Sequence, residues 1–99
     1  MEIMRFIGEK FSKKTMLEEL LYNSRFKPAF ISKNSDIVEL EPADEYTYLT
    51  FNKVNIPAIV NYVKLYADYM EITYHPADSN ELVVKIPYND ISSMEIETR

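Results

Sequence analysis

The sequence predicts an α+β domain in which an N-terminal helix packs on a strongly bent antiparallel sheet or a small β-barrel. A capping-box pattern, followed by apolar residues at helical spacing, occurs near the N-terminus. Later segments are rich in tyrosine, valine and isoleucine and alternate apolar with polar residues, as half-buried strands do. With 99 residues, 46% of them hydrophobic, the chain is predicted to form one domain with one core over residues 1–99.

The helix is predicted over residues 16–24. Thr15 and Glu18 have the spacing of a capping box, which satisfies free amides at a helix start. Pro28 prevents much continuation of the helix, because proline lacks the amide hydrogen and clashes with the preceding turn. The face predicted to be buried carries Met16, Leu17, Leu20, Leu21 and Ser24.

After the helix, short extended segments are predicted at residues 29–32 and 36–41, separated by a turn. A loop at residues 41–45 then leads into residues 46–52, the clearest strand of the chain because aromatic and β-branched residues dominate it. One side of this strand carries Tyr46, Tyr48 and Thr50, and the other carries Thr47, Leu49 and Phe51.

Residues 55–75 allow two interpretations. A helix would begin with Asn55 as its cap and Pro57 in its first turn, followed by apolar residues at helical spacing. A pair of strands would instead reverse direction near Ala67 and Asp68. The density of valine, isoleucine and tyrosine favours the strands.

The last third of the chain predicts a hairpin, a corner and a final strand. Segments 69–75 and 81–86 flank a loop with turn-forming residues. Met70, Ile72 and Tyr74 share one face of the first strand, and Leu82, Val84 and Ile86 share one face of the second. Pro87 ends the second strand, because it cannot donate to a central ladder. A short helical turn then brings Ile91 to one end of the barrel, and a strand begins in a new direction.

Residues 68–97, DYMEITYHPADSNELVVKIPYNDISSMEI, resemble the strand, hairpin, corner and strand of bacterial PH-like domains. They are also similar to the second motif of Sm-like small barrels, which follow an N-terminal helix. The pattern departs from both families, since its last element is a strand where a PH-like domain closes with a helix. No glycine follows Gly8 to serve the bent strand of an Sm-like barrel. The resemblance implies binding or assembly and assigns no functional residue.

No residue set predicts an enzyme, and we assign no catalytic, cofactor or metal site. One glycine, Gly8, cannot form a phosphate-binding loop, which needs several. The absence of cysteine excludes disulfides, thiolate nucleophiles and cysteine-based zinc sites. His75 and Asp78 offer two candidate ligands, too few to define a metal site. Paired carboxylates such as Glu95 and Glu97 are typical of a solvated strand face.

The charges are unevenly distributed. Residues 1–33 carry seven basic and four acidic side chains, whereas residues 34–99 carry four basic and twelve acidic ones. The basic segment can pack beside the acidic body of its own fold. It can also form a patch for nucleic acid or lipid head groups, although the acidic body would repel phosphates. The patch residues would be Lys10, Lys13, Lys14, Arg25 and Lys27.

The tyrosines point to a protein partner. Tyr46 and Tyr48 share one strand face, and Tyr62 and Tyr66 share another. An exposed pair would make an aromatic patch of the kind enriched in protein–protein hot spots. The alternative is that these rings cover the core with their hydroxyls at the rim.

These observations favour a non-enzymatic protein-binding or self-assembling module, with a homo-oligomer as one form. A small accessory or inhibitor protein of a phage or mobile element fits this size and charge. The alternative is a small module that binds nucleic acid or lipid head groups through the basic segment. We expect a cytoplasmic location, in the host cytoplasm for a viral protein, because no signal-peptide pattern or membrane-length apolar run is present.

Overall fold

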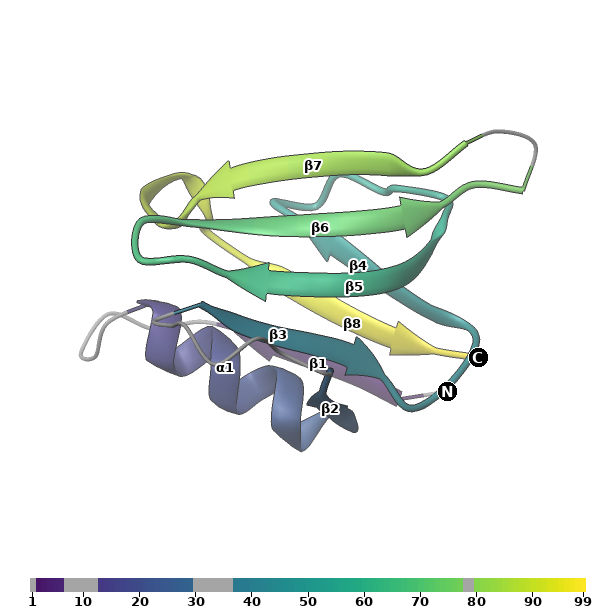
Figure 1. Ribbon diagram of the computed structural model, residues 1–99, viewed down its shortest axis with the longest axis horizontal. Coiled ribbons are helices and arrows are strands. Elements are labelled where there is room, and N and C mark those ends of the chain that lie inside the picture. The colour runs from purple at the N-terminus through teal and green to yellow at the C-terminus, as the bar shows by residue number, and fades with distance from the viewer. Residues whose placement is uncertain (1, 7–12, 30–36, 78–79) are drawn as a thin grey trace.

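The computed structural model describes residues 2–6, 13–29, 37–77 and 80–99. Within these ranges one α-helix and antiparallel strands are present, which supports the predicted α+β class. The five-stranded sheet lies in front of the three-stranded sheet in Figure 1, and the helix lies beside them. The elements are β1 (Glu2–Phe6), α1 (Lys13–Asn23), β2 (Phe26–Pro28), β3 (Val38–Pro42), β4 (Thr47–Phe51), β5 (Ile59–Leu65), β6 (Tyr69–His75), β7 (Leu82–Pro87), the 3-10 turn η1 (Tyr88–Asp90) and β8 (Met94–Thr98).

The strand order is β1-β8-β4 in the smaller sheet and β2-β3-β5-β6-β7 in the larger one. The expected small barrel is not confirmed, because the described strands form two separately hydrogen-bonded sheets. A bulge between Val60 and Tyr62 shifts the register of β5 against β6. Such a bulge bends its strand and increases the local twist.

Helix α1 buries the predicted face. Leu17 and Leu21 are fully buried, and Ser24 is buried just beyond the helix end. The predicted start was wrong, since the helix begins at Lys13 and places Thr15 inside its first turn. The first residue of the helix also contacts a residue far along the chain. The Lys13 ammonium group donates a hydrogen bond to the Ile91 carbonyl at 3.1 Å.

The strand predictions for residues 46–52 and 55–75 are confirmed. Side chains alternate between buried and half-buried along β4, with Thr47 and Leu49 facing inward. The helical alternative for residues 55–75 was wrong, since β5 and β6 form a hairpin. The Tyr66 amide donates to the Tyr69 carbonyl at 2.9 Å at its turn. Most of the extended segment predicted at 29–32 lies outside the described residues.

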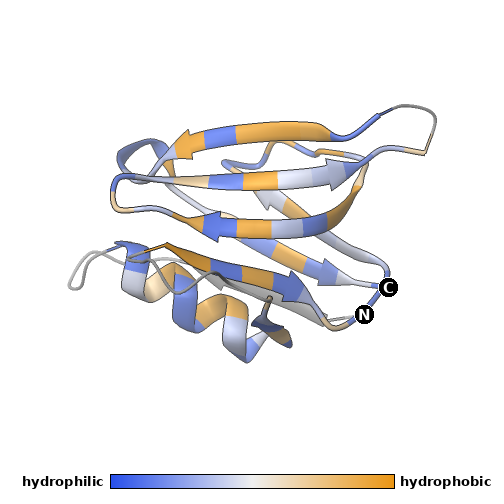
Figure 2. Ribbon diagram, in the orientation of Figure 1, coloured by the Kyte–Doolittle hydropathy of each residue, from blue (hydrophilic) through white to orange (hydrophobic). Residues whose placement is uncertain are grey.

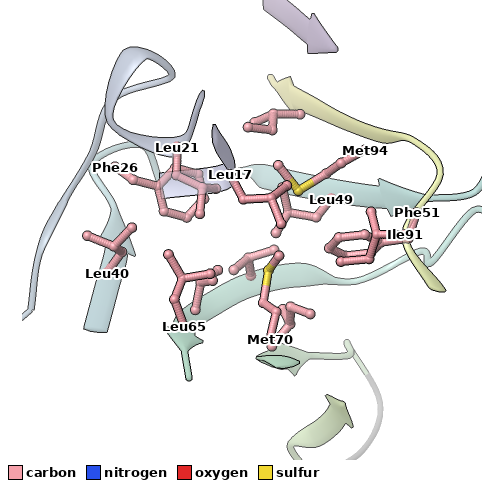
Figure 3. Packing of buried hydrophobic residues seen from close by; sticks show 14 of the residues in the cluster. Leu17, Leu21, Phe26, Leu40, Leu49, Phe51, Leu65, Met70, Ile91 and Met94 are labelled. Carbon is pink, nitrogen blue, oxygen red and sulfur yellow. The ribbon is translucent and has the colours of Figure 1, made fainter. Parts of the chain in front are cut away.

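The core lies between the two sheets and against α1. Figure 3 shows side chains from the helix, from both sheets and from the corner before β8 pointing toward one another. Burying each leucine or isoleucine of this kind contributes about 1.5–3 kcal/mol relative to exposure. Tyr74 is buried on β6, and its hydroxyl donates to the Leu49 carbonyl on β4 at 3.4 Å. The fully buried members include Leu17, Leu21, Leu40, Leu49, Val63, Leu65, Met70, Ile72, Tyr74, Ile91 and Met94.

The predicted corner after β7 is confirmed as η1 followed by the fully buried Ile91. The Asn52 side chain, directly after β4, forms hydrogen bonds with the backbone of this corner. Its Oδ1 accepts hydrogen bonds from the Ser92 amide at 2.8 Å and the Ser93 amide at 3.2 Å. Its Nδ2 donates to the Asp90 carbonyl at 2.7 Å. Asn52 has φ 51, a left-handed conformation that asparagine tolerates better than most residues.

We predict that Asn52→Ala lowers the free energy of unfolding by about 1–2 kcal/mol, because each lost hydrogen bond contributes about 0.5–1.5 kcal/mol. Asn52→Asp keeps the oxygen that accepts from Ser92 and Ser93 but sets a second oxygen against the Asp90 carbonyl, so it is expected to be destabilised through that contact alone. Urea denaturation of both variants measures this difference. Asn89→Ala, an exposed change in η1, is the matched control. Equal stability of Asn52→Ala and Asn89→Ala would contradict the assigned role of Asn52.

Candidate protein-interaction surface

The tyrosines of β4 lie on the outer face of the three-stranded sheet. Tyr46, just before the strand, is 52% exposed. Tyr48 is half-buried, and the Arg99 guanidinium lies 4.5 Å from the centre of its ring. Arg99 also forms an ion pair with Glu97, which lies opposite Tyr48 on β8. Of Tyr46 and Tyr48, only Tyr46 is therefore accessible to a partner.

The other two tyrosines lie on the outer face of the five-stranded sheet. Tyr62 is 44% exposed. Tyr66 is half-buried and stacks on Tyr69, with ring centroids 4.6 Å apart. Lys64 is the intervening outward residue between Tyr62 and Tyr66. The structure therefore places the two predicted pairs on different sheets and separates the members of the second pair.

A row of alternating charges crosses the same outer face. Glu39, Lys64, Glu71 and Lys85 occupy paired positions on β3, β5, β6 and β7. The Lys64–Glu39 distance is 3.5 Å and the Lys85–Glu71 distance is 4.0 Å. Desolvation lowers the pKa of Lys64, but Glu39, Tyr66 and Glu71 together raise it by more, so the pKa is raised overall. Surface pairs contribute only about 0–1 kcal/mol each, so the row mainly keeps this face electrically balanced.

Two of the predicted basic residues are paired with carboxylates of the same chain. The Arg25 guanidinium lies 3.3 Å from the Asp44 carboxylate. The Lys27 ammonium group lies 3.7 Å from the Glu41 carboxylate, across the β2–β3 pair. This geometry supports the interpretation that the basic segment packs beside the acidic body.

The remaining basic residues lie elsewhere or outside the described ranges. Lys13 donates to the Ile91 carbonyl, and it lines a groove with Lys14 and Tyr88. These two lysines begin α1, whereas Arg25 and Lys27 follow its end, and an 11-residue helix is about 16 Å long. Lys10 lies outside the described residues. The described basic side chains therefore do not form one patch.

An acidic groove of about 500 Å³ lies beside β5. Its lining includes Glu41, Asp44, Glu45, Tyr62 and Glu81. Two of these carboxylates are the partners of Lys27 and Arg25. Among the described residues, no cluster of three or more histidine or carboxylate side chains that could hold a metal ion is found. His75 is exposed at the end of β6.

The exposed sheet edge along β7 is the feature that sequence reasoning missed, although the strand itself was predicted. Strand β7 forms one edge of the five-stranded sheet, and Figure 2 shows it as a largely hydrophobic strand. Leu82, Val84 and Ile86 lie on one face of β7, as predicted. Val84 and Ile86 are half-buried and pack against the core, whereas Leu82 is 45% exposed and Val83 beside it is 50% exposed.

The exposed residues of β7 are continuous with the outer face. Val83 pairs with Thr73 on β6, and Thr73 pairs with Tyr62 on β5. Tyr62, Thr73 and Val83 therefore form a row next to the row of charges. We call strand β7 with its outward residues Val83 and Lys85, together with Tyr62, the β7 edge surface.

Comparisons with models of known protein families, with curated proteins and with solved structures give no match. The resemblance of residues 68–97 to PH-like and Sm-like domains stays a prediction. Within the described ranges, no helix has the length and apolar character needed to cross a membrane.

Two tyrosines outside the predicted set are buried. Desolvation raises the pKa of the Tyr74 hydroxyl. Desolvation, with Glu18 and Asp68 adding to it, raises the pKa of Tyr88, whose hydroxyl donates to the Tyr66 carbonyl at 2.6 Å. Both hydroxyls therefore favour the neutral form in the folded protein.

We predict that stability falls as the pH rises above about 10, the ordinary tyrosine pKa. The unfolded chain then loses protons that the native Tyr74 and Tyr88 retain, so ionisation favours unfolding. Urea denaturation across the alkaline range, with tyrosinate absorbance recorded in parallel, measures the slope. Tyr74→Phe flattens this slope, and the exposed control Tyr46→Phe leaves it unchanged. An equally steep slope in Tyr74→Phe would contradict the assignment.

Proposed function

We propose that the protein is a non-enzymatic protein-binding module that uses its β7 edge surface. The observation that carries this proposal is an apolar edge strand with Leu82 and Val83 about half exposed. Edge strands present unpaired amide and carbonyl groups that can pair with another chain. Addition of a strand to a sheet edge is a recurrent mode of protein recognition.

Tyr62 extends the same surface. It lies in one row with Thr73 and Val83, two strands away from Val83. At about 4.8 Å per strand, β5 lies about 10 Å from β7, so Tyr62 contacts a partner that also covers the outer face of the sheet. Tyr46 and Tyr48 lie on the other sheet and are not part of this proposed surface.

The charge balance supports a protein partner over a phosphate-bearing one. The net charge is −5, and the described Arg25 and Lys27 are held in ion pairs within the chain. An acidic protein repels nucleic acid, because the phosphates carry charge of the same sign. An accessory or inhibitor protein of a phage or mobile element, acting in the cytoplasm, is one form of such a module.

We predict that Val83→Pro abolishes capture of the protein's partner from cell extract, whether the partner is another protein or a second copy. Proline removes the amide hydrogen of residue 83 and is tolerated at edge positions whose amide faces solvent. Quantitative affinity capture compares wild type, Val83→Pro and the matched control Val83→Thr, which keeps the amide. Circular dichroism verifies that each variant is folded. A captured set that Val83→Pro leaves unchanged would refute the proposed function.

A further inference from the structure

We infer that the occupant of the β7 edge is a second copy of this chain, an inference that rests on the proposed function. Two β7 strands pair antiparallel about a two-fold axis at Val83, and they join the five-stranded sheets of both copies into one. Three features carry this inference: the direction of the backbone groups along β7, the charges that flank Val83, and the row of charges on the outer face.

The hydrogen bonding of the β5–β6 hairpin shows which backbone groups of β6 point toward β5 and which point toward β7. The Tyr66 amide donates to the Tyr69 carbonyl, so the backbone groups of Tyr69 point toward β5. In antiparallel strands, both backbone groups of a residue point to the same side, and successive residues alternate. The groups of Met70, Ile72 and Tyr74 therefore point toward β7, where the paired residues are Ile86, Val84 and Leu82.

A second hydrogen bond gives the same alternation independently. The Tyr88 amide donates to the Asp68 carbonyl at 3.2 Å, so even-numbered positions face β6 at this end too. The backbone groups of Val83 and Lys85 consequently point to the free edge. Pro87, which has no amide hydrogen, also occupies an outward position, the location in which an edge strand tolerates proline.

Charge selects the register of the pairing. With Val83 opposite Val83, Glu81 of each copy lies opposite Lys85 of the other. Opposite charges in directly paired positions stabilise a sheet, and like charges destabilise it. Outward backbone groups also face outward groups in this register, so Val83 donates to and accepts from its counterpart.

Neighbouring registers are less favourable. With Val84 opposite Val84, Lys85 faces Val83 and Glu81 faces Pro87, which cannot donate a hydrogen bond. With Lys85 opposite Lys85, two ammonium groups face one another across the interface. The register centred on Val83 avoids both defects.

The same register covers the exposed apolar residues and extends the charge row. Leu82 and Val83, 45% and 50% exposed, then lie against Val84 and Val83 of the second copy. On the outer face, the row Glu39, Lys64, Glu71 and Lys85 continues into Glu81 of the second copy. The alternation of charge is therefore unbroken across the interface.

Charge exchange tests this arrangement in the purified full chain. Sedimentation and light scattering over a concentration range measure self-association of wild type, Glu81→Lys, Lys85→Glu and an equimolar mixture of the two variants. Each variant alone places like charges opposite one another and is expected to associate about tenfold more weakly, given two pairs of modest energy. The mixture restores both opposite-charge pairs and is expected to recover wild-type association. Glu19→Lys, a change at an exposed acidic residue on α1, is the control for net charge.

A wild-type chain that stays monomeric at every concentration would overturn the inference. An association that the single variants do not weaken, or that their mixture does not restore, would overturn it as well. Neither result contradicts the proposed function if the Val83→Pro variant fails to capture another protein that the wild type captures. Conversely, capture that is insensitive to Val83→Pro refutes the proposed function itself.

Discussion

The structure depends on the change of sheet at the corner between β7 and β8. After β7 the chain leaves the five-stranded sheet, and β8 lies between β1 and β4 in the smaller sheet, so both sheets pack on one core. Ile91 occupies the core at this point, and Asn52 satisfies the backbone of the corner from the end of β4. Buried apolar area supplies most of the energy of such a fold, whereas the polar contacts of Asn52 specify where the chain turns.

Ending the larger sheet at this corner leaves β7 as an edge. Proteins commonly blunt such edges with charged or proline residues. This strand carries Lys85 and Pro87, yet Leu82 and Val83 remain about half exposed between them and the preceding hairpin loop. Elsewhere on the outer faces, Glu71 is held in an ion pair with Lys85 and the Tyr48 ring is covered by Arg99. The β7 edge is therefore where apolar contact and free backbone groups coincide.

Local patterns in the sequence predicted much of the fold. The alternation of residues 46–52 and the turn near Ala67 gave the correct strands, because side-chain period and turn chemistry are local properties. The helix start was misplaced, since the Thr15 pattern has no information on the contact between Lys13 and Ile91, 78 residues apart. The division into two sheets and the exposure of Leu82 depend on strand order. Strand order depends on the whole fold and cannot be predicted from the spacing of apolar residues. The β7 edge surface was missed for the same reason.

Amide hydrogen exchange along β7, measured residue by residue at increasing protein concentration, tests the central claim most directly. In dilute solution, the amides of Val84 and Ile86 should be protected by β6, whereas those of Val83 and Lys85 should exchange rapidly. At high concentration, Val83 and Lys85 should become protected together. Protection of Val83 and Lys85 in dilute solution, or their rapid exchange at every concentration, would contradict the account.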